Sequence, residues 1–252
     1  MENKREYPVL KEACRNLRLS RVHETALEWE ETYAKEDSHL NFLTSLLHHE
    51  WEQRLKESAS RRIKAANFPK IKTIESFDFI KSSHLPENKI RNLLIGNYIA
   101  QAEPIILLGE PGTGKTHLAT AFGYAAATQG LSVKFVTAAK LANDLVEAKD
   151  GFQLNRLMNM YRRTKLLIID ELGYLPLRKQ DAELIFQLLS DRHELLPLII
   201  TTNLPFNEWT TVFTDKRLCR ALLDRITHRA HIIETGIQSA RLAESLTKKS
   251  KK

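Results

Sequence analysis

Residues 104–123 read PIILLGEPGTGKTHLATAFG, and this stretch decides the class of fold. Four aliphatic residues at 105–108 predict a buried strand, and the residues from 117 onward predict a helix. Between them, GEPGTGKT at 109–116 matches the pattern G-x-x-x-x-G-K-[ST] at every fixed position. A strand, a glycine-rich loop and a helix in this order predict a phosphate-binding loop, because backbone N–H groups and a helix N-terminus can surround phosphate oxygens.

The residue types within this loop indicate separate roles. Gly112 and Gly114 allow the backbone to approach a ligand closely. Lys115 supplies a positive charge for the β- and γ-phosphates, and the hydroxyl of Thr116 is placed to bind Mg²⁺. The whole loop is the expected nucleotide-binding set: Gly109, Glu110, Pro111, Gly112, Thr113, Gly114, Lys115 and Thr116.

A second stretch, LLIIDELGYLPL at 166–177, places two acids at the end of an apolar strand. Asp170 is expected to hold Mg²⁺, directly or through water, and Glu171 to polarise the attacking water as a general base. The alternative is a helix-capping Asp followed by a surface Glu. A kinase or a GTPase usually lacks the second acid, so the pair favours ATP hydrolysis, with ATP and Mg²⁺ as cofactors.

Three further residues are candidates for the catalytic machinery. LIITTN at 198–203 ends in Asn203, which is expected at the ligand-binding edge of the sheet and could hold the lytic water, or could only form a turn. ALLDRITHR at 221–229 predicts a helix carrying Arg225 and Arg229, where an arginine could reach a neighbouring subunit's nucleotide or form a surface ion pair. Arg241, in GIQSARL, is either a second γ-phosphate sensor or another surface ion pair.

The pattern of apolar residues predicts two domains. Short apolar runs at 104–110, 132–138, 165–171 and 196–203 alternate with helix-length stretches, which predicts an α/β domain with a parallel sheet between two helical layers. Residues 10–64 contain no Gly or Pro and have apolar residues at helical spacing, with Ser38 as the expected cap of a second helix. We therefore expect a helical N-terminal domain at 1–66, the α/β domain at 67–247 and a basic tail at 248–252.

Composition narrows the class of protein. With 252 residues and 42% hydrophobic residues, the chain can bury a substantial core. No apolar run approaches the roughly 20 residues of a membrane span and no secretory signal is visible, so we expect a cytoplasmic protein without a membrane partner. Cys14 and Cys219 lack metal-ligand spacing, which fits a reducing compartment and argues against a disulfide framework or a zinc site.

The net charge of +7 suggests a polyanionic partner. Four lysines in the final KKSKK account for more than half of this excess. Such a tail is either a solvated chain end or a contact with nucleic-acid phosphates that reads no sequence.

Several segments together resemble the IstB family of insertion-sequence transposition helper ATPases, which are AAA+ relatives of the helicase loader DnaC. The match rests on FPKIKTIESFDF at 68–79, the phosphate loop, VKFVTAAKLANDL at 133–145, DELGYLP at 170–176, TTNLPFNEW at 201–209 and LLDRITHRA at 222–230. The resemblance implies that residues 68–79 border the adenine pocket and that Asn203 is the first sensor. It also implies that Arg225 is a finger acting in trans and Arg241 the second sensor, although the family usually has Tyr where this chain has Ala240.

The resemblance further implies partners. Family members assemble on double-stranded DNA as ATP-dependent homo-oligomers and present the target to a transposase. The sequence has no obvious base-reading motif, so we expect weak sequence selectivity. Loader-like relatives carry an extra DNA-contacting helix after the second strand. The corresponding region of this chain contains four basic residues that either contact DNA phosphates or are exposed to solvent: Lys140, Lys149, Arg162 and Arg163. Two alternatives stay open: a replicative helicase loader of the DnaC type, and a DNA-architectural protein that has lost turnover.

Overall fold

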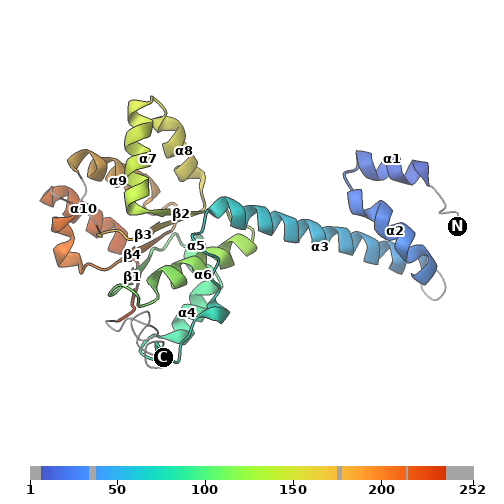
Figure 1. Cartoon of the computed structure of the whole chain (residues 1–252), viewed down its shortest axis with the longest axis horizontal. Helices are drawn as coiled ribbons and strands as arrows, with labels where there is room; N and C mark the ends of the chain where they lie inside the picture. The colour runs from blue at the N-terminus through green and yellow to red at the C-terminus, as the bar shows by residue number, and fades with distance from the viewer. Residues whose placement is uncertain (1–6, 34–37, 175–177, 214, 237–252) are drawn as a thin grey trace, which may run out of the picture. The chain divides into compact units, whose positions relative to one another are not determined.

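The computed structural model describes residues 7–33, 38–174, 178–213 and 215–236 (Figure 1). Its contacts divide the chain into two compact units, Met1–Ser60 and Arg61–Lys252. The third helix, α3 (His39–Ala66), continues through this division and ends at the residue where sequence placed the domain boundary. The exact limits of functional domains therefore stay a prediction.

The first unit contains helices only. α1 (Pro8–Asn16) begins with a proline, which is favoured in the first turn of a helix, and α2 (Ser20–Tyr33) follows. The hydroxyl of Ser38 accepts a hydrogen bond from the Asn41 N–H at 3.2 Å, so the predicted cap of the helix that begins at His39 is confirmed. Buried residues of this unit form a small core centred on Cys14, Val22 and Leu46.

The second unit contains a five-stranded, wholly parallel sheet in the order β2-β3-β4-β1-β5. Three short elements precede it: η1 (Ile74–Ser76), α4 (Glu87–Leu94) and α5 (Asn97–Ala100). The remaining elements, in chain order, are β1 (Ile105–Leu108), α6 (Lys115–Thr128), β2 (Val133–Thr137), α7 (Ala138–Asp150), α8 (Leu154–Arg163), β3 (Leu166–Asp170), α9 (Lys179–Arg192), β4 (Leu198–Thr202), η2 (Phe206–Thr211), α10 (Lys216–Thr227) and β5 (His231–Glu234).

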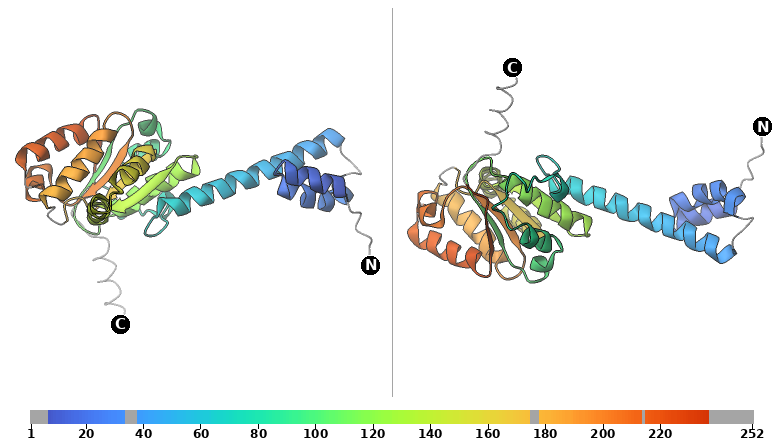
Figure 2. Two further views of the ribbon diagram at one scale, coloured as in Figure 1. Left: turned by 90° about the horizontal axis from the view of Figure 1, so that it is seen from above. Right: turned by 90° about the horizontal axis from the view of Figure 1, so that it is seen from below.

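Alternating side chains of the strands supply two separate cores, one on each face of the sheet. Ile106, Leu167 and Ile169 pack into the core beneath α7, α8, α9 and α10. Ile105 and Ile168 point to the opposite face, where α6 and the short helices before the sheet cover them. Figures 1 and 2 show these helices on the two sides of the strands, so the predicted three-layer α/β architecture is confirmed.

Two local predictions were incomplete. The four expected strands all form, but the fifth, His231–Glu234, was missed because it is a short edge strand with only two aliphatic residues. α10 ends at Thr227, so Arg229 lies beyond the helix, with a left-handed φ of 54°, and not on it as expected. None of the helices in the described part of the chain is long and apolar enough to cross a membrane.

Candidate nucleotide-binding site

The glycine-rich loop joins the end of β1 to the start of α6 in a conformation that requires glycine. Gly112 and Gly114 have φ values of 88° and 97°, in the region that side chains disfavour. A Cβ added at Gly114 would also lie only 2.8 Å from the ring of Phe77. The aromatic ring of the segment before the sheet therefore packs directly on the backbone of the loop.

The loop is also tied to the residues that follow β5. The Glu110 N–H donates to the carbonyl of Gly236 at 3.1 Å. The hydroxyls of buried Thr113 and Thr235 lie 2.6 Å apart, and a Cβ at Gly109 would collide with the Thr235 hydroxyl. Sequence analysis missed Thr235 because the strand before it was not recognised.

The ammonium group of Lys115 contacts the backbone of the loop. Its Nζ atom donates to the carbonyl oxygens of Gly109 at 2.6 Å and Glu110 at 2.8 Å. These contacts hold the ammonium group against the backbone of the loop, and Lys115 also lines the cavity beside it.

Asp170 connects the loop to the centre of the sheet. The Thr116 hydroxyl lies 3.1 Å from each oxygen of the Asp170 carboxylate, and the Thr201 hydroxyl donates to Oδ1 at 2.5 Å. Because parallel strands end at one edge of the sheet, these residues from three elements meet there. Thr201 was not predicted as a site residue, although it lies two positions before Asn203.

The environment of Asp170 changes its acidity. The residue is only 4% exposed, and this burial raises the pKa of its carboxyl. Hydrogen bonds from Thr201 and Thr116 oppose the shift, as does the positive charge of Lys115. Burial of this carboxylate costs free energy, because the charge loses its hydration. A cation beside it would offset that cost.

Glu171 has a different environment from its neighbour. Its side chain is exposed and its backbone adopts a left-handed φ of 60°, which is uncommon for a residue other than glycine. The Glu171 N–H donates to the Thr201 hydroxyl at 2.9 Å, and the next residue, Leu172, donates to the Thr201 carbonyl. This turn separates the two acids, leaving Asp170 buried and Glu171 open to the adjoining cavity.

A cavity of about 550 Å³ lies over the loop, a size within the range of small-molecule sites. Glu171, Asn203 and residues 111–117 line it, so the structure brings these predicted site residues together. The segment expected to border the adenine also contributes, through Pro69, Lys70, Lys72, Ser76, Phe77 and Asp78.

His117 fixes that segment against the first turn of α6. Its Nε2 atom lies 3.0 Å from the carbonyl oxygen of Thr73 and 3.2 Å from the hydroxyl of Ser76. Its ring meets the Phe77 ring edge to face at 5.0 Å. Burial lowers the pKa of His117, which favours the neutral ring in this position. No sequence pattern had indicated a role for this histidine.

Arg225 and the glycine-rich loop of the same chain lie at opposite ends of the strands. It lines a different cavity together with Pro104 and Leu198, which lie at the start of β1 and β4, whereas the loop follows the end of β1. Its Nη1 atom donates to the Ser190 hydroxyl at 2.6 Å, and its guanidinium lies 4.9 Å from the centre of the Phe186 ring. Arg241 and the basic tail lie outside the described residues.

The four candidate DNA-binding residues differ in their partners. Lys140 forms an ion pair with Asp144 at 2.8 Å, and Arg162 binds Asp191 through Nε at 3.0 Å and through Nη2. Lys149 and Arg163 are exposed at the ends of α7 and α8, the two helices that follow β2.

A parallel sheet in this order, with a glycine-rich loop after β1 and two adjacent acids at the end of β3, defines a phosphate-loop nucleotide-binding fold of the AAA+ class. Within this class, the chain belongs to the family described as IstB-like ATP binding protein, whose model matches residues 13–248.

Similar proteins are consistent with this assignment. A Pseudomonas aeruginosa protein named as the putative ATP-binding protein of insertion sequence IS21 is 36% identical over 215 residues, which cover 85% of this chain and 81% of that protein. The replication initiator DnaA, in a structure bound to AMPPCP and single-stranded DNA, is 26% identical with a TM-score of 0.55. That match covers 66% of this chain but only 50% of the DnaA chain. The DnaC helicase loader has the same fold, with a TM-score of 0.52, 24% identity and coverage of 60% and 87% of the two chains.

Proposed function

We propose that this protein is an ATP-dependent transposition helper that hydrolyses ATP in the cavity over residues 109–116. The observation that carries the proposal is the junction of Thr116, Asp170 and Thr201, with Glu171 beside it on the cavity. This junction joins the loop that binds phosphates to the strand ends that provide acid and base groups.

The residues present fit a magnesium ion. The Thr116 hydroxyl and the Asp170 carboxylate are adjacent oxygen donors, which Mg²⁺ prefers, and the buried carboxylate needs positive charge beside it. When bound, Mg²⁺ neutralises charge that develops on the phosphates. Thr116 and Asp170 are the groups that would hold it.

Other side chains of the site then have distinct tasks. Lys115 exchanges its carbonyl contacts for phosphate oxygens, and Glu171 accepts the proton of the attacking water. Asn203, which also lines the cavity, orients that water. Arg225 acts on the nucleotide of a neighbouring subunit, since it lies at the opposite end of the strands from its own loop. Arg241 is proposed as a second sensor on the strength of the family resemblance alone.

The biological partners follow from the family. The relative in Pseudomonas aeruginosa is named after an insertion sequence, and the DnaA structure contains single-stranded DNA. On the strength of the family resemblance, we propose double-stranded DNA and a transposase as partners of an ATP-dependent homo-oligomer, with hydrolysis resetting the assembly. The two free cysteines, both buried, fit action in the reducing cytoplasm.

A comparison of Glu171→Gln with Lys115→Ala tests the proposal. The full-length Glu171→Gln protein should bind ATP and assemble on DNA while phosphate release falls by roughly 10²–10⁴-fold, because only the base is lost. Lys115→Ala should instead lose nucleotide binding. An unchanged rate in Glu171→Gln would remove Glu171 from the base role, and no phosphate release by the wild type with or without DNA would contradict an ATPase.

A second measurement separates the main proposal from a helicase loader. The full chain loaded with ATP should capture the transposase of its own element and should not capture a replicative helicase. The reverse result would favour a loader.

A further inference from the structure

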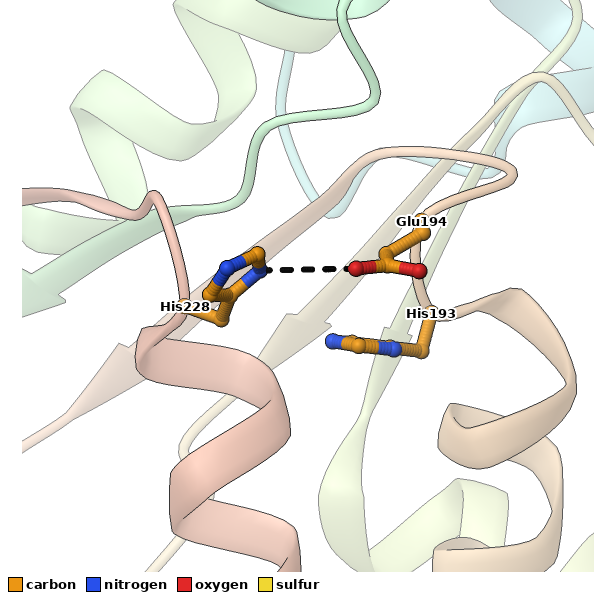
Figure 3. Close-up of side chains that lie close together, drawn as sticks. All are labelled: His193, Glu194 and His228. Atoms are coloured by element: carbon orange, nitrogen blue, oxygen red, sulfur yellow. Dashed lines mark ion pairs between the residues drawn. The ribbon is translucent and has the colours of Figure 1, made fainter.

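The ends of two helices meet at a cluster of potential metal ligands. His193 directly follows α9 and His228 directly follows α10, each as the C-terminal capping residue of its helix. Glu194 comes next to His193 in the chain. Figure 3 shows the two imidazole rings and the carboxylate facing one another from these two elements.

The spacing of the donor atoms is close to that of a metal site. One nitrogen from each histidine and one Glu194 oxygen all lie within 4.8 Å of one another, and the Nδ1 atom of His228 is 3.7 Å from Oε1 of Glu194. Ligands at about 2.0–2.2 Å from a tetrahedral Zn²⁺ lie roughly 3.4 Å apart. Small rotations of the side chains would therefore complete the geometry.

The three proposed ligands differ in how far they are buried. The Nε2 atom of His193 is buried and has no hydrogen-bond partner among the described residues. The Glu194 and His228 side chains are 65% and 53% exposed, so both can rotate at little cost. All three residues line a cavity of about 110 Å³, which has room for an ion and a water molecule.

Charges of both signs surround the cluster. Two helix C-termini carry partial negative charge toward the cluster. Of the two nearby arginines, Arg229 is paired with Glu103 at 3.1 Å, whereas Arg225 donates to the neutral hydroxyl of Ser190 and keeps its positive charge. Glu194 adds a full negative charge that reaches the metal position directly.

We propose that His193, Glu194 and His228 bind a divalent transition-metal ion of the zinc type, with the fourth position open to water. Two imidazoles and one carboxylate suit Zn²⁺, Co²⁺ or Ni²⁺ and not Mg²⁺ or Ca²⁺, which prefer oxygen ligands. The expectation against a zinc site rested on cysteine spacing, and this site contains no cysteine. The bound ion would join the ends of α9 and α10. Arg225 lies on α10 and contacts Ser190 of α9.

Metal titration of the full chain tests this site. Chelator-treated protein is titrated with ZnCl₂ by calorimetry, and with CoCl₂ while the visible spectrum is recorded. We expect one Zn²⁺ per chain, a cobalt spectrum of tetrahedral type, and a higher Tm with Zn²⁺ but not with equimolar MgCl₂.

Variants assign the ligands. Glu194→Gln and His228→Gln alter exposed side chains and should each weaken Zn²⁺ binding by more than roughly tenfold. Mutation of residues that only hydrogen-bond to a metal ligand typically lowers metal affinity about 10–100-fold, and loss of a ligand itself should cost at least as much. His48→Gln is the matched control, because His48 is also exposed and close to a glutamate, Glu52, but belongs to the other unit. Failure of the wild type to bind Zn²⁺, or equal binding by the control and both ligand variants, would overturn the proposal.

Discussion

The hydroxyl of Thr201 lies 2.5 Å from Oδ1 of Asp170, and both residues are almost completely buried. The same hydroxyl accepts the N–H of Glu171 at 2.9 Å. One oxygen atom on β4 thus contacts the carboxylate of Asp170, the last residue of β3, and the backbone N–H of Glu171, the residue that follows it. This contact makes Thr201 a positioning residue for the proposed magnesium ligand and the proposed base.

Replacement of Thr201 tests that role. Thr201→Val keeps the shape but leaves the Glu171 N–H without this partner, at a cost of about 1–3 kcal/mol. It also removes one of the two hydroxyl groups that donate to Oδ1 of Asp170, leaving that of Thr116. Thr201→Ser keeps the hydroxyl and loses one methyl group. We expect kcat to fall strongly in the valine variant and to recover in the serine variant, measured by phosphate release. Equal kcat values for the two variants would show that the hydroxyl is not needed.

Asp170 gives a prediction for stability against pH. The pKa of Asp170 is higher in the folded protein than in the unfolded chain, so the folded state binds more protons than the unfolded state between these two values. The free energy of unfolding therefore falls as the pH rises from the ordinary pKa of a carboxyl group through the raised pKa. The neutral Asp170→Asn variant should therefore have a higher Tm than the wild type at pH 7. This difference should shrink as the pH is lowered toward about 4, near the ordinary pKa of an aspartate.

Thermal unfolding of both proteins between pH 4 and pH 7 measures this difference, in the presence of a chelator. Asp170→Asn should also lose ATP turnover, because it removes a proposed metal ligand. A lower Tm for Asp170→Asn across the whole range would contradict the sign of the shift.

Mixing two inactive variants tests whether Arg225 acts in trans. Arg225→Ala retains an intact loop and should bind ATP as the wild type does, whereas Lys115→Ala lacks nucleotide binding but retains the arginine. Each should be inactive alone, and equimolar mixed oligomers should recover part of the activity. Normal turnover by Arg225→Ala alone, or no recovery in mixtures that demonstrably assemble, would end the trans-finger proposal.

The salt dependence of DNA binding distinguishes the two exposed candidates, Lys149 and Arg163, from the paired Lys140. Lys149→Ala and Arg163→Ala should each reduce the slope of log K against log salt by about 1, because each exposed cation would lose one phosphate contact. Lys140→Ala is the matched control on α7, since its charge already pairs with Asp144. Equal slopes for all three variants and the wild type would place the DNA contact elsewhere.

Local patterns in the sequence were sufficient for much of the fold and site. Each predicted strand is a short apolar run, and each forms because both faces of a parallel sheet are buried. The loop at 109–116 was recognisable because its glycines, lysine and threonine are close together in the chain. Asp170 and Glu171 were recognisable only in relation to that loop.

The missed features all depend on contacts between distant residues. β5 forms beside β1 although its own sequence is weakly apolar. Thr235 meets Thr113 only after that strand has paired. His193 and His228 come together because α9 and α10 end at the same edge of the domain.

The sequence by itself determined the class of this protein, because a phosphate-binding loop and an acid pair are encoded in short contiguous segments whose local geometry follows from residue type. Only the tertiary structure decided how those segments act together: which hydroxyl holds Asp170, which histidine packs on Phe77, and how far Arg225 lies from its own loop. The physical reason is that hydrogen bonds and charge interactions depend on distances of a few ångströms, which chain separation does not specify.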